Sequence, residues 1–165
     1  HGWAHERAIA GVLHKIVNSW IIEHTTNDFI GVNYYLRLLF DALRPWRIWG
    51  PGPRNDIGWE INAPSLTKLL LELKGYNIPL IITENGIADA TDSLRGEFIR
   101  RHIEALTEAM KSGVNCLGYY HWTPFDNFEW DQGFGARFGL IKVDFETQER
   151  TVRPSAYVYR DIIRT

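Results

Sequence analysis

Apolar side chains recur three and four positions apart in four stretches of the chain, the spacing that gathers them on one face of an α-helix. The helices predicted in this way cover residues 3–22, 62–74, 92–112 and 154–163. In the third stretch, Asp92 or Ser93 is placed to cap the amino end, and Gly113 is placed to stop the helix. Each helix therefore presents an apolar face that another element has to cover.

Three short apolar runs, near residues 29–35, 79–84 and 115–122, separate these helices and predict β-strands. The stretch after the first run is marked as a loop by Pro45 and its neighbouring Gly and Pro residues. Residues 139–153 predict a hairpin ahead of the last helix. Strands that alternate with amphipathic helices are typical of βαβ units, so the sequence predicts an α/β fold with a parallel sheet in one domain.

Polar and aromatic side chains stand where each predicted strand ends. They are Asn33, Tyr34 and Tyr35 on the first strand, Thr83, Glu84 and Asn85 on the second, and His121 and Trp122 on the third. Ligands bind at the carboxyl ends of parallel strands, so these side chains are expected to converge on one site. Glu84 is the most informative, because a glutamate closing an apolar strand is uncommon unless it is paired or functional. The alternative is that Glu84 pairs with an arginine and the aromatic residues belong to the core. The next two residues, Asn85 and Gly86, predict a turn.

Residues 122–139 (WTPFDNFEWDQGFGARFG) place six aromatic rings around the carboxylates Asp126, Glu129 and Asp131. Rings cover the C–H faces of a sugar and carboxylates accept hydrogen bonds from its hydroxyls, so this loop suits carbohydrate recognition. An interface patch or a hydrophobic lid would have the same composition.

Composition narrows the function classes further. A net charge of −2 over 165 residues disfavours nucleic acid and anionic membranes as partners. The single cysteine, Cys116, excludes an intrachain disulfide and favours a reducing, cytoplasmic location. No apolar run approaches the roughly 18 residues of a membrane span, and the first residues lack the basic-then-apolar pattern of a signal peptide, so a soluble protein is expected. The first residue is histidine rather than methionine, which suggests a processed or trimmed piece.

Histidines and glycines give no metal or phosphate motif. His1 and His5 are four apart, but Ile9 stands where a HExxH motif needs its second histidine, so a solvated helix end is the simpler interpretation. His102 lies in the apolar stripe of its helix and is expected to be a partly buried structural residue, whereas His121 is a candidate for the site. No cofactor and no metal are predicted.

Five ordered motifs, together with DIGWEI, carry a family resemblance. They are FIGVNYY (29–35), DIGWEI (56–61), IITENG (81–86), GYYHWTPFDNFEW (118–130), GFGARFGLIKVDF (133–145) and RPSAYVYRDI (153–162). From about Phe29 to its end, the chain resembles the C-terminal part of glycoside hydrolase family 1, the retaining β-glucosidases and β-galactosidases. The resemblance implies strands six to eight of a (β/α)8 TIM barrel. Residues 1–165 would then be a C-terminal fragment of a single catalytic domain.

The resemblance also implies roles for individual residues. Glu84 would be the catalytic nucleophile, flanked by Asn33 and by Tyr35, whose hydroxyl donates to the carboxylate. Trp122 would form the wall or floor of the sugar subsite, Glu129 and Trp130 would bind sugar hydroxyls, and Phe138 would line the same pocket. A second carboxylate at Glu129 would repel a phosphate, so 6-phospho-sugars are disfavoured as substrates.

The chain departs from the family in what it lacks. A closed barrel typically has about 250 residues, and three strands cannot close one. The family's acid/base glutamate in an Asn-Glu-Pro motif, its first five strands and its sugar-binding QxxxE segment are all absent from this sequence. We therefore expect an N-terminal barrel fragment as partner, without which the chain is inactive. A non-catalytic carbohydrate-binding or scaffold fragment is the alternative, and transglycosylation or S-glycoside hydrolysis would change the reaction but keep the fold.

Overall fold

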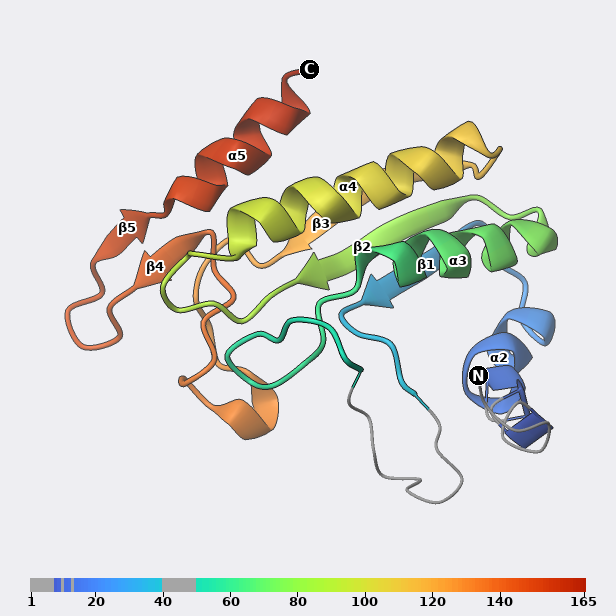
Figure 1. The fold of residues 1–165 in the computed structure, drawn as a ribbon, viewed down its shortest axis with the longest axis horizontal. Helices are drawn as coiled ribbons and strands as arrows, with labels where there is room; N and C mark the ends of the chain where they lie inside the picture. Colours follow the sequence, from blue (N-terminus) through green and yellow to red (C-terminus); the bar gives the residue numbers. More distant parts are fainter. Residues whose placement is uncertain (1–7, 10, 13, 40–49) are drawn as a thin grey trace.

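The computed structural model describes residues 8–9, 11–12, 14–39 and 50–165 (Figure 1). Three expectations from the sequence fall on other positions: the start of the helix predicted over 3–22, the solvated His1 and His5, and the part of the predicted loop around Pro45. These lie outside the described residues.

A three-stranded parallel sheet forms the centre of the fold. Its strands are β1 (Ile30–Tyr34), β2 (Leu80–Gly86) and β3 (Cys116–Trp122), which lie side by side in that order. Figure 1 shows their three arrowheads pointing the same way. The three predicted strands and the parallel α/β sheet are thus confirmed. Both edges of this sheet are open, so the described residues form no closed barrel.

Two helices cover one face of the sheet, as Figure 1 shows. They are α3 (Ala63–Leu73) and α4 (Arg95–Lys111), and each connects two neighbouring strands. Successive strand residues face opposite sides, so alternate side chains of β1 and β2 point toward these helices. The core that results contains Ile30, Val32, Tyr34, Leu66, Leu70, Leu73, Leu80, Ile82, Leu106, Ala109 and Val114.

The last part of the chain packs beside α4. A hairpin of β4 (Ile141–Val143) and β5 (Arg150–Val152) leads to α5 (Pro154–Ile163), which contacts α4. The short turn η2 (Lys74–Tyr76) follows α3. The short turn η3 (Trp130–Gln132) interrupts the loop after β3. The predicted hairpin and last helix are confirmed. Within the described ranges, no helix is long and apolar enough to cross a membrane.

In the helical segment ahead of β1, Ile22 packs against the core, but several other apolar side chains are exposed. It continues through the π-helical turn η1 (Lys15–Ser19) into α2 (Trp20–Glu23). Val12, Ile16 and Trp20, spaced four apart, are 59%, 64% and 55% exposed. The predicted helix therefore forms in its described part, but no described element covers the face that carries Val12, Ile16 and Trp20.

The amino end of α4 is capped differently from the prediction. One oxygen of the Asp89 carboxylate accepts hydrogen bonds of 2.8 and 2.9 Å from the two backbone N–H groups at the start of α4. Asp92 has a φ of 61° and accepts instead from the backbone N–H and the hydroxyl of Ser155, at the start of α5. The prediction of Asp92 or Ser93 as the cap is wrong, because the loop returns to a carboxylate several residues earlier.

Replacing Asn62 by alanine should lower the free energy of unfolding by about 1 kcal/mol. Asn62 Oδ1 accepts a hydrogen bond of 3.0 Å from Ser65 N in the first turn of α3, and alanine leaves that N–H without this acceptor. Urea unfolding followed by tryptophan fluorescence measures the loss. Asn62→Ser is the control, because serine keeps a capping oxygen, and an equal loss in both variants would contradict the capping role.

Candidate active site

Near its carboxyl end, β2 contains one residue more than either neighbouring strand. The pairings are Val32 with Ile82 and Asn33 with Glu84 on one side, and Tyr119 with Ile82 and His121 with Asn85 on the other. Regular alternation would turn Glu84 toward the helices, as it does Leu80 and Ile82. A bulge of one residue shifts the alternation, so it turns Glu84 to the opposite side.

Glu84 and Thr83 both meet side chains from the end of β1. The Tyr35 hydroxyl donates to Glu84 Oε2 at 2.8 Å, and the Thr83 hydroxyl donates to Asn33 Oδ1 at 2.6 Å. Asn33 and Tyr35 are two residues apart and lie on the same side of the chain. The described hydrogen-bond partner of Glu84 is therefore the Tyr35 hydroxyl. The alternative interpretation, in which Glu84 pairs with an arginine, predicted a different partner. Asn33 reaches Thr83 rather than the nucleophile candidate.

A second carboxylate comes from the loop after β3. Trp122 Nε1 donates to Glu129 Oε1 at 2.9 Å. Burial raises the pKa of Glu129, the hydrogen bond from Trp122 opposes this rise, and the negative charge of Glu84 adds to it. Glu84 and Glu129 thus lie close enough to influence each other.

Tyr35 is held by aromatic rings and interacts with both carboxylates. Its ring contacts Trp59 and Phe138 edge-on, with centroids 5.8 and 6.1 Å away. Burial raises the pKa of the Tyr35 hydroxyl well above its usual range, and the hydrogen bond to Glu84 and the charges of Glu84 and Glu129 add to the rise. The Tyr35 hydroxyl therefore stays protonated at neutral pH and is the donor in its hydrogen bond to Glu84.

Trp59 is a residue of this site that the sequence interpretation missed. Asn55 Oδ1 accepts from the backbone N–H of Ile57 and of Trp59, at 3.1 and 2.9 Å, and so fixes the turn that presents the indole. The DIGWEI motif was visible in the sequence. Its contact with Tyr35 was not, because the two residues meet only in the folded chain.

Phe138 and Trp130, both expected in the sugar pocket, lie in opposite environments. Phe138 is 2% exposed and packs against Tyr35 and Trp59, so it supports the site from behind. Trp130 begins η3 and is 88% exposed. The structure therefore brings Glu84, Tyr35, Trp122, Glu129 and Phe138 together and leaves Trp130 in solvent.

His121, a site candidate because it stands beside Trp122, faces away from the site. Its ring lies 5.9 Å from that of Tyr159 in α5 and is buried near Arg95 and His102 of α4. Burial lowers the pKa of His121 to about 3, and the charge of Arg95 contributes. The prediction is wrong because successive strand residues face opposite sides, so His121 and Trp122 cannot share one.

Asp126 is a structural carboxylate rather than an acceptor open to a sugar. Arg153 donates to its two oxygens at 2.9 and 3.1 Å, and the backbone N–H groups of Gly139 and Val143 donate at 2.9 and 3.3 Å. Its side chain is fully buried, whereas Asp131 is exposed. Of the three carboxylates predicted to accept from hydroxyls, only Glu129 faces the site.

The turn predicted at Asn85 and Gly86 does not form. Both residues belong to β2, and Gly86 pairs with Trp122 of β3. A Cβ on Gly86 would come within 2.0 Å of the Trp122 carbonyl oxygen. Glycine is therefore needed here because the two strands approach closely, and not because the chain turns.

The arrangement suits nucleophilic chemistry on a polar, hydroxyl-rich ligand. It offers one partly exposed carboxylate held by a hydroxyl donor, a second carboxylate nearby, and aromatic rings around them. Across the described residues, no group of three or more His, Cys, Asp or Glu side chains could hold a metal ion.

The model of the family described as glycosyl hydrolase family 1 matches residues 49–165. The chain is 40% identical to a beta-galactosidase of Sulfolobus acidocaldarius over 154 residues and 37% identical to a beta-galactosidase of Pyrococcus woesei over 161 residues. These alignments cover 84% and 83% of this chain but 31% and 32% of the relatives. The chain thus spans about a third of the length of these relatives.

Solved structures of beta-glucosidases also match most of this chain with about a third of their own length. The hyperthermophilic beta-glucosidase of Pyrococcus furiosus superposes with a TM-score of 0.88 at 39% identity, over 98% of this chain and 38% of that one. A beta-glucosidase of Thermotoga maritima, solved in complex with methoxycarbonyl-substituted glucoimidazole, has a TM-score of 0.78 at 34% identity. That likeness covers 84% of this chain and 35% of the other.

Proposed function

Because the chain belongs to glycosyl hydrolase family 1, we propose that it carries the nucleophile of a retaining β-glycosidase that hydrolyses β-glucosides or β-galactosides. The family resemblance seen in the sequence and the predicted fold class, βα units of a TIM barrel left incomplete in this chain, are confirmed. The observation that carries the proposal is the Glu84 carboxylate at the end of β2, bonded to the Tyr35 hydroxyl. The glucoimidazole bound by the Thermotoga maritima relative supports a sugar as ligand.

In the proposed reaction, a Glu84 oxygen attacks the anomeric carbon while the bond from that carbon to the aglycone oxygen breaks. The electron pair of the broken bond passes to the aglycone oxygen, which takes a proton from a second carboxylic acid about 5 Å from Glu84. Water, deprotonated by the same group, then displaces Glu84 from the sugar. Two inversions at one carbon retain its configuration, and the Tyr35 hydroxyl keeps the attacking carboxylate in place.

Trp122 and Glu129 are the proposed sugar-recognition residues. The indole covers C–H groups of the ring, and the carboxylate accepts hydrogen bonds from hydroxyls. Trp130 can contact the sugar only if η3 turns toward it. Phe138 contributes indirectly, because its ring packs against the ring of Tyr35. Asn33 lies beside the proposed nucleophile, because its side-chain oxygen accepts a hydrogen bond from Thr83, the residue before Glu84. A sugar phosphate would bring negative charge to Glu129, so the proposed substrates are unphosphorylated.

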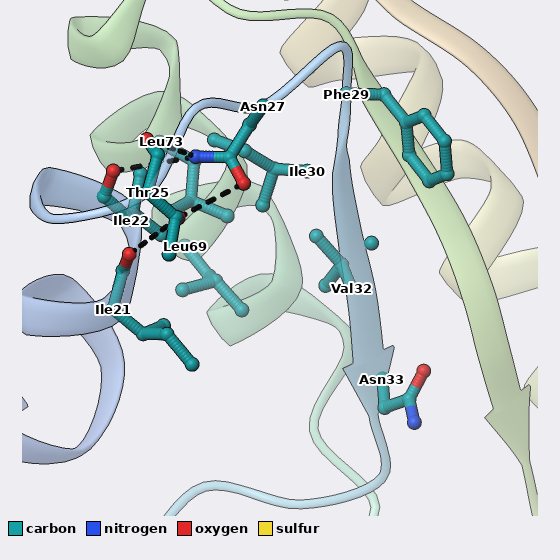
Figure 2. Close-up of a pocket in the computed structure, with 11 residues that line it drawn as sticks. Ile21, Ile22, Thr25, Asn27, Phe29, Ile30, Val32, Asn33, Leu69 and Leu73 are labelled. Carbon is teal, nitrogen blue, oxygen red and sulfur yellow. Dashed lines mark hydrogen bonds between the residues drawn. The ribbon is translucent and has the colours of Figure 1, made fainter.

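We further propose that the acid/base carboxylate comes from an N-terminal portion of the same TIM-barrel catalytic domain, of which residues 1–165 are the C-terminal part. Figure 2 shows a groove along the open edge of β1, lined by apolar side chains that include Ile21, Val32 and Leu69. At the other edge of the sheet, Leu117 and Tyr120 of β3 are more than half exposed. Neighbouring barrel strands would cover both edges, and without them we expect no activity.

Treating the complete barrel with a 2-fluoro β-glucoside that has a good leaving group should attach one fluoro-sugar to Glu84. The fluorine slows both steps and the leaving group restores the first, so the glycosyl-enzyme accumulates. Mass spectrometry of a peptic digest locates the added mass. Glu84→Gln is the control that should remain unlabelled, and a label on another residue would overturn the nucleophile assignment.

A non-catalytic carbohydrate-binding or scaffold fragment is the competing function, favoured by the exposed Phe128, Trp130 and Phe134 in the loop after β3. It predicts sugar binding with neither label nor turnover in the complete barrel. Transglycosylation and S-glycoside hydrolysis depend on the acid/base side, so an alcohol acceptor and a thioglycoside test them. The cytoplasmic location favoured by the single Cys116 stays a prediction.

A further inference from the structure

Asn85, the residue after Glu84, is a fully buried amide that connects three strands. Its Nδ2 donates to the Tyr34 carbonyl oxygen at 2.6 Å, and its Oδ1 accepts from the Tyr119 hydroxyl at 2.8 Å. The first contact ties β2 to β1 and the second ties β2 to β3. Both cross the sheet next to the bulge that turns Glu84 toward the site.

The bulge explains why an amide is suited to this position. An extra residue in one strand interrupts the regular ladder of backbone hydrogen bonds and leaves the bulged residue unpaired. A side chain that can both donate and accept restores a link to each neighbouring strand, and the asparagine amide does so at short reach. Aspartate has the same shape but, when ionised, cannot donate to the Tyr34 carbonyl.

The amide is also one residue away from each end of the Tyr35–Glu84 hydrogen bond. Asn85 follows Glu84, and Tyr34, whose carbonyl accepts from Asn85, precedes Tyr35. A displacement at the amide therefore moves both partners of that bond. The hydrogen bond from Tyr119 to Asn85 is retained at neutral pH, because burial raises the pKa of the Tyr119 hydroxyl well above its usual range and keeps it a donor.

We propose that Asn85 is a positioning residue that holds the Glu84 carboxylate and the Tyr35 hydroxyl in register for attack on the sugar. This inference rests on the proposed function. Asn85 does not touch the substrate. It acts through the nucleophile, so its loss should affect the rate of glycosylation more than the affinity for substrate.

The test is the Asn85→Asp variant of the complete barrel. The rate at which the 2-fluoro glucoside labels Glu84 should fall about 100-fold, with KM for an aryl β-glucoside nearly unchanged. Tyr35→Phe, which removes the hydroxyl that Asn85 is proposed to position, should slow labelling as well. In the Tyr35→Phe background, Asn85→Asp should slow labelling by much less than about 100-fold, because the hydrogen bond that Asn85 positions is already absent.

Two further variants keep the result decisive. Tyr119→Phe removes only the second contact of the amide and should slow labelling by about tenfold, so it settles the question if Asn85→Asp does not fold. Thr67→Val is the matched control, because it removes a buried hydrogen bond of 3.0 Å to the Ala105 carbonyl far from the site. This control should lower stability and leave the labelling rate unchanged.

If Asn85→Asp and Tyr119→Phe lose stability like Thr67→Val but keep the labelling rate, Asn85 has only a structural role and the inference is overturned. If the wild-type barrel is not labelled at Glu84, the proposed function fails and the inference fails with it. If the wild-type barrel is labelled at Glu84 and the variants are labelled at the same rate, the inference about Asn85 fails and the proposed function stands.

Discussion

The Glu84→Ala variant of the complete barrel should turn over an aryl β-glucoside at least about 10⁴-fold more slowly than the wild type. Alanine removes the oxygen that would form the covalent bond to the sugar, so the two-step route is lost. Water in the vacated space is a poor nucleophile without a base. Release of the aryl group, followed by absorbance under saturating substrate, measures the fall.

Added azide or formate should restore part of the activity of Glu84→Ala. The small anion enters the space left by the carboxylate and attacks from the same side, so the product has the inverted α configuration, which NMR detects. Glu108→Ala, on the exposed surface of α4, is the control and should behave like the wild type. Near-normal turnover in Glu84→Ala would contradict the assignment of Glu84 as the nucleophile.

The second large effect is on stability: Asp126→Ala should lower the free energy of unfolding by about 3–5 kcal/mol. The carboxylate is fully buried and accepts from both terminal nitrogens of Arg153, whose own side chain is 6% exposed. Alanine leaves that guanidinium buried without its counter-charge and also removes the acceptor for the backbone N–H groups of Gly139 and Val143. Urea unfolding of the complete barrel measures the loss.

An exposed pair provides the matched control. Arg101 Nε lies 2.6 Å from Glu97 Oε1 on α4, and the two side chains are 65% and 56% exposed. Glu97→Ala should therefore change stability by no more than about 1 kcal/mol, since solvent screens such pairs. If Asp126→Ala cost no more than Glu97→Ala, the buried pair would not be holding the loop after β3 to the start of α5.

Periodicity predicted where the described helices and strands lie, because each element has to turn one apolar face inward and that requirement is written locally. The apolar run before Glu84 and the stripe through Leu66, Leu70 and Leu73 are examples. Predictions that relied on a single polar residue were less secure. Asp92 could cap a helix, and Asn85 with Gly86 could form a turn, but each found a distant partner that a local pattern does not contain.

The sequence by itself determined which side chains with chemical capacity stand at the strand ends, and motif resemblance determined the family. Tertiary structure alone decided which way those side chains face. The bulge in β2 sends Glu84 to Tyr35, the pleat of β3 sends His121 into the helix layer, and Arg153 takes Asp126 away from the site. The reason is that side-chain direction in a strand depends on register, and register is set by pairing between strands far apart in the chain.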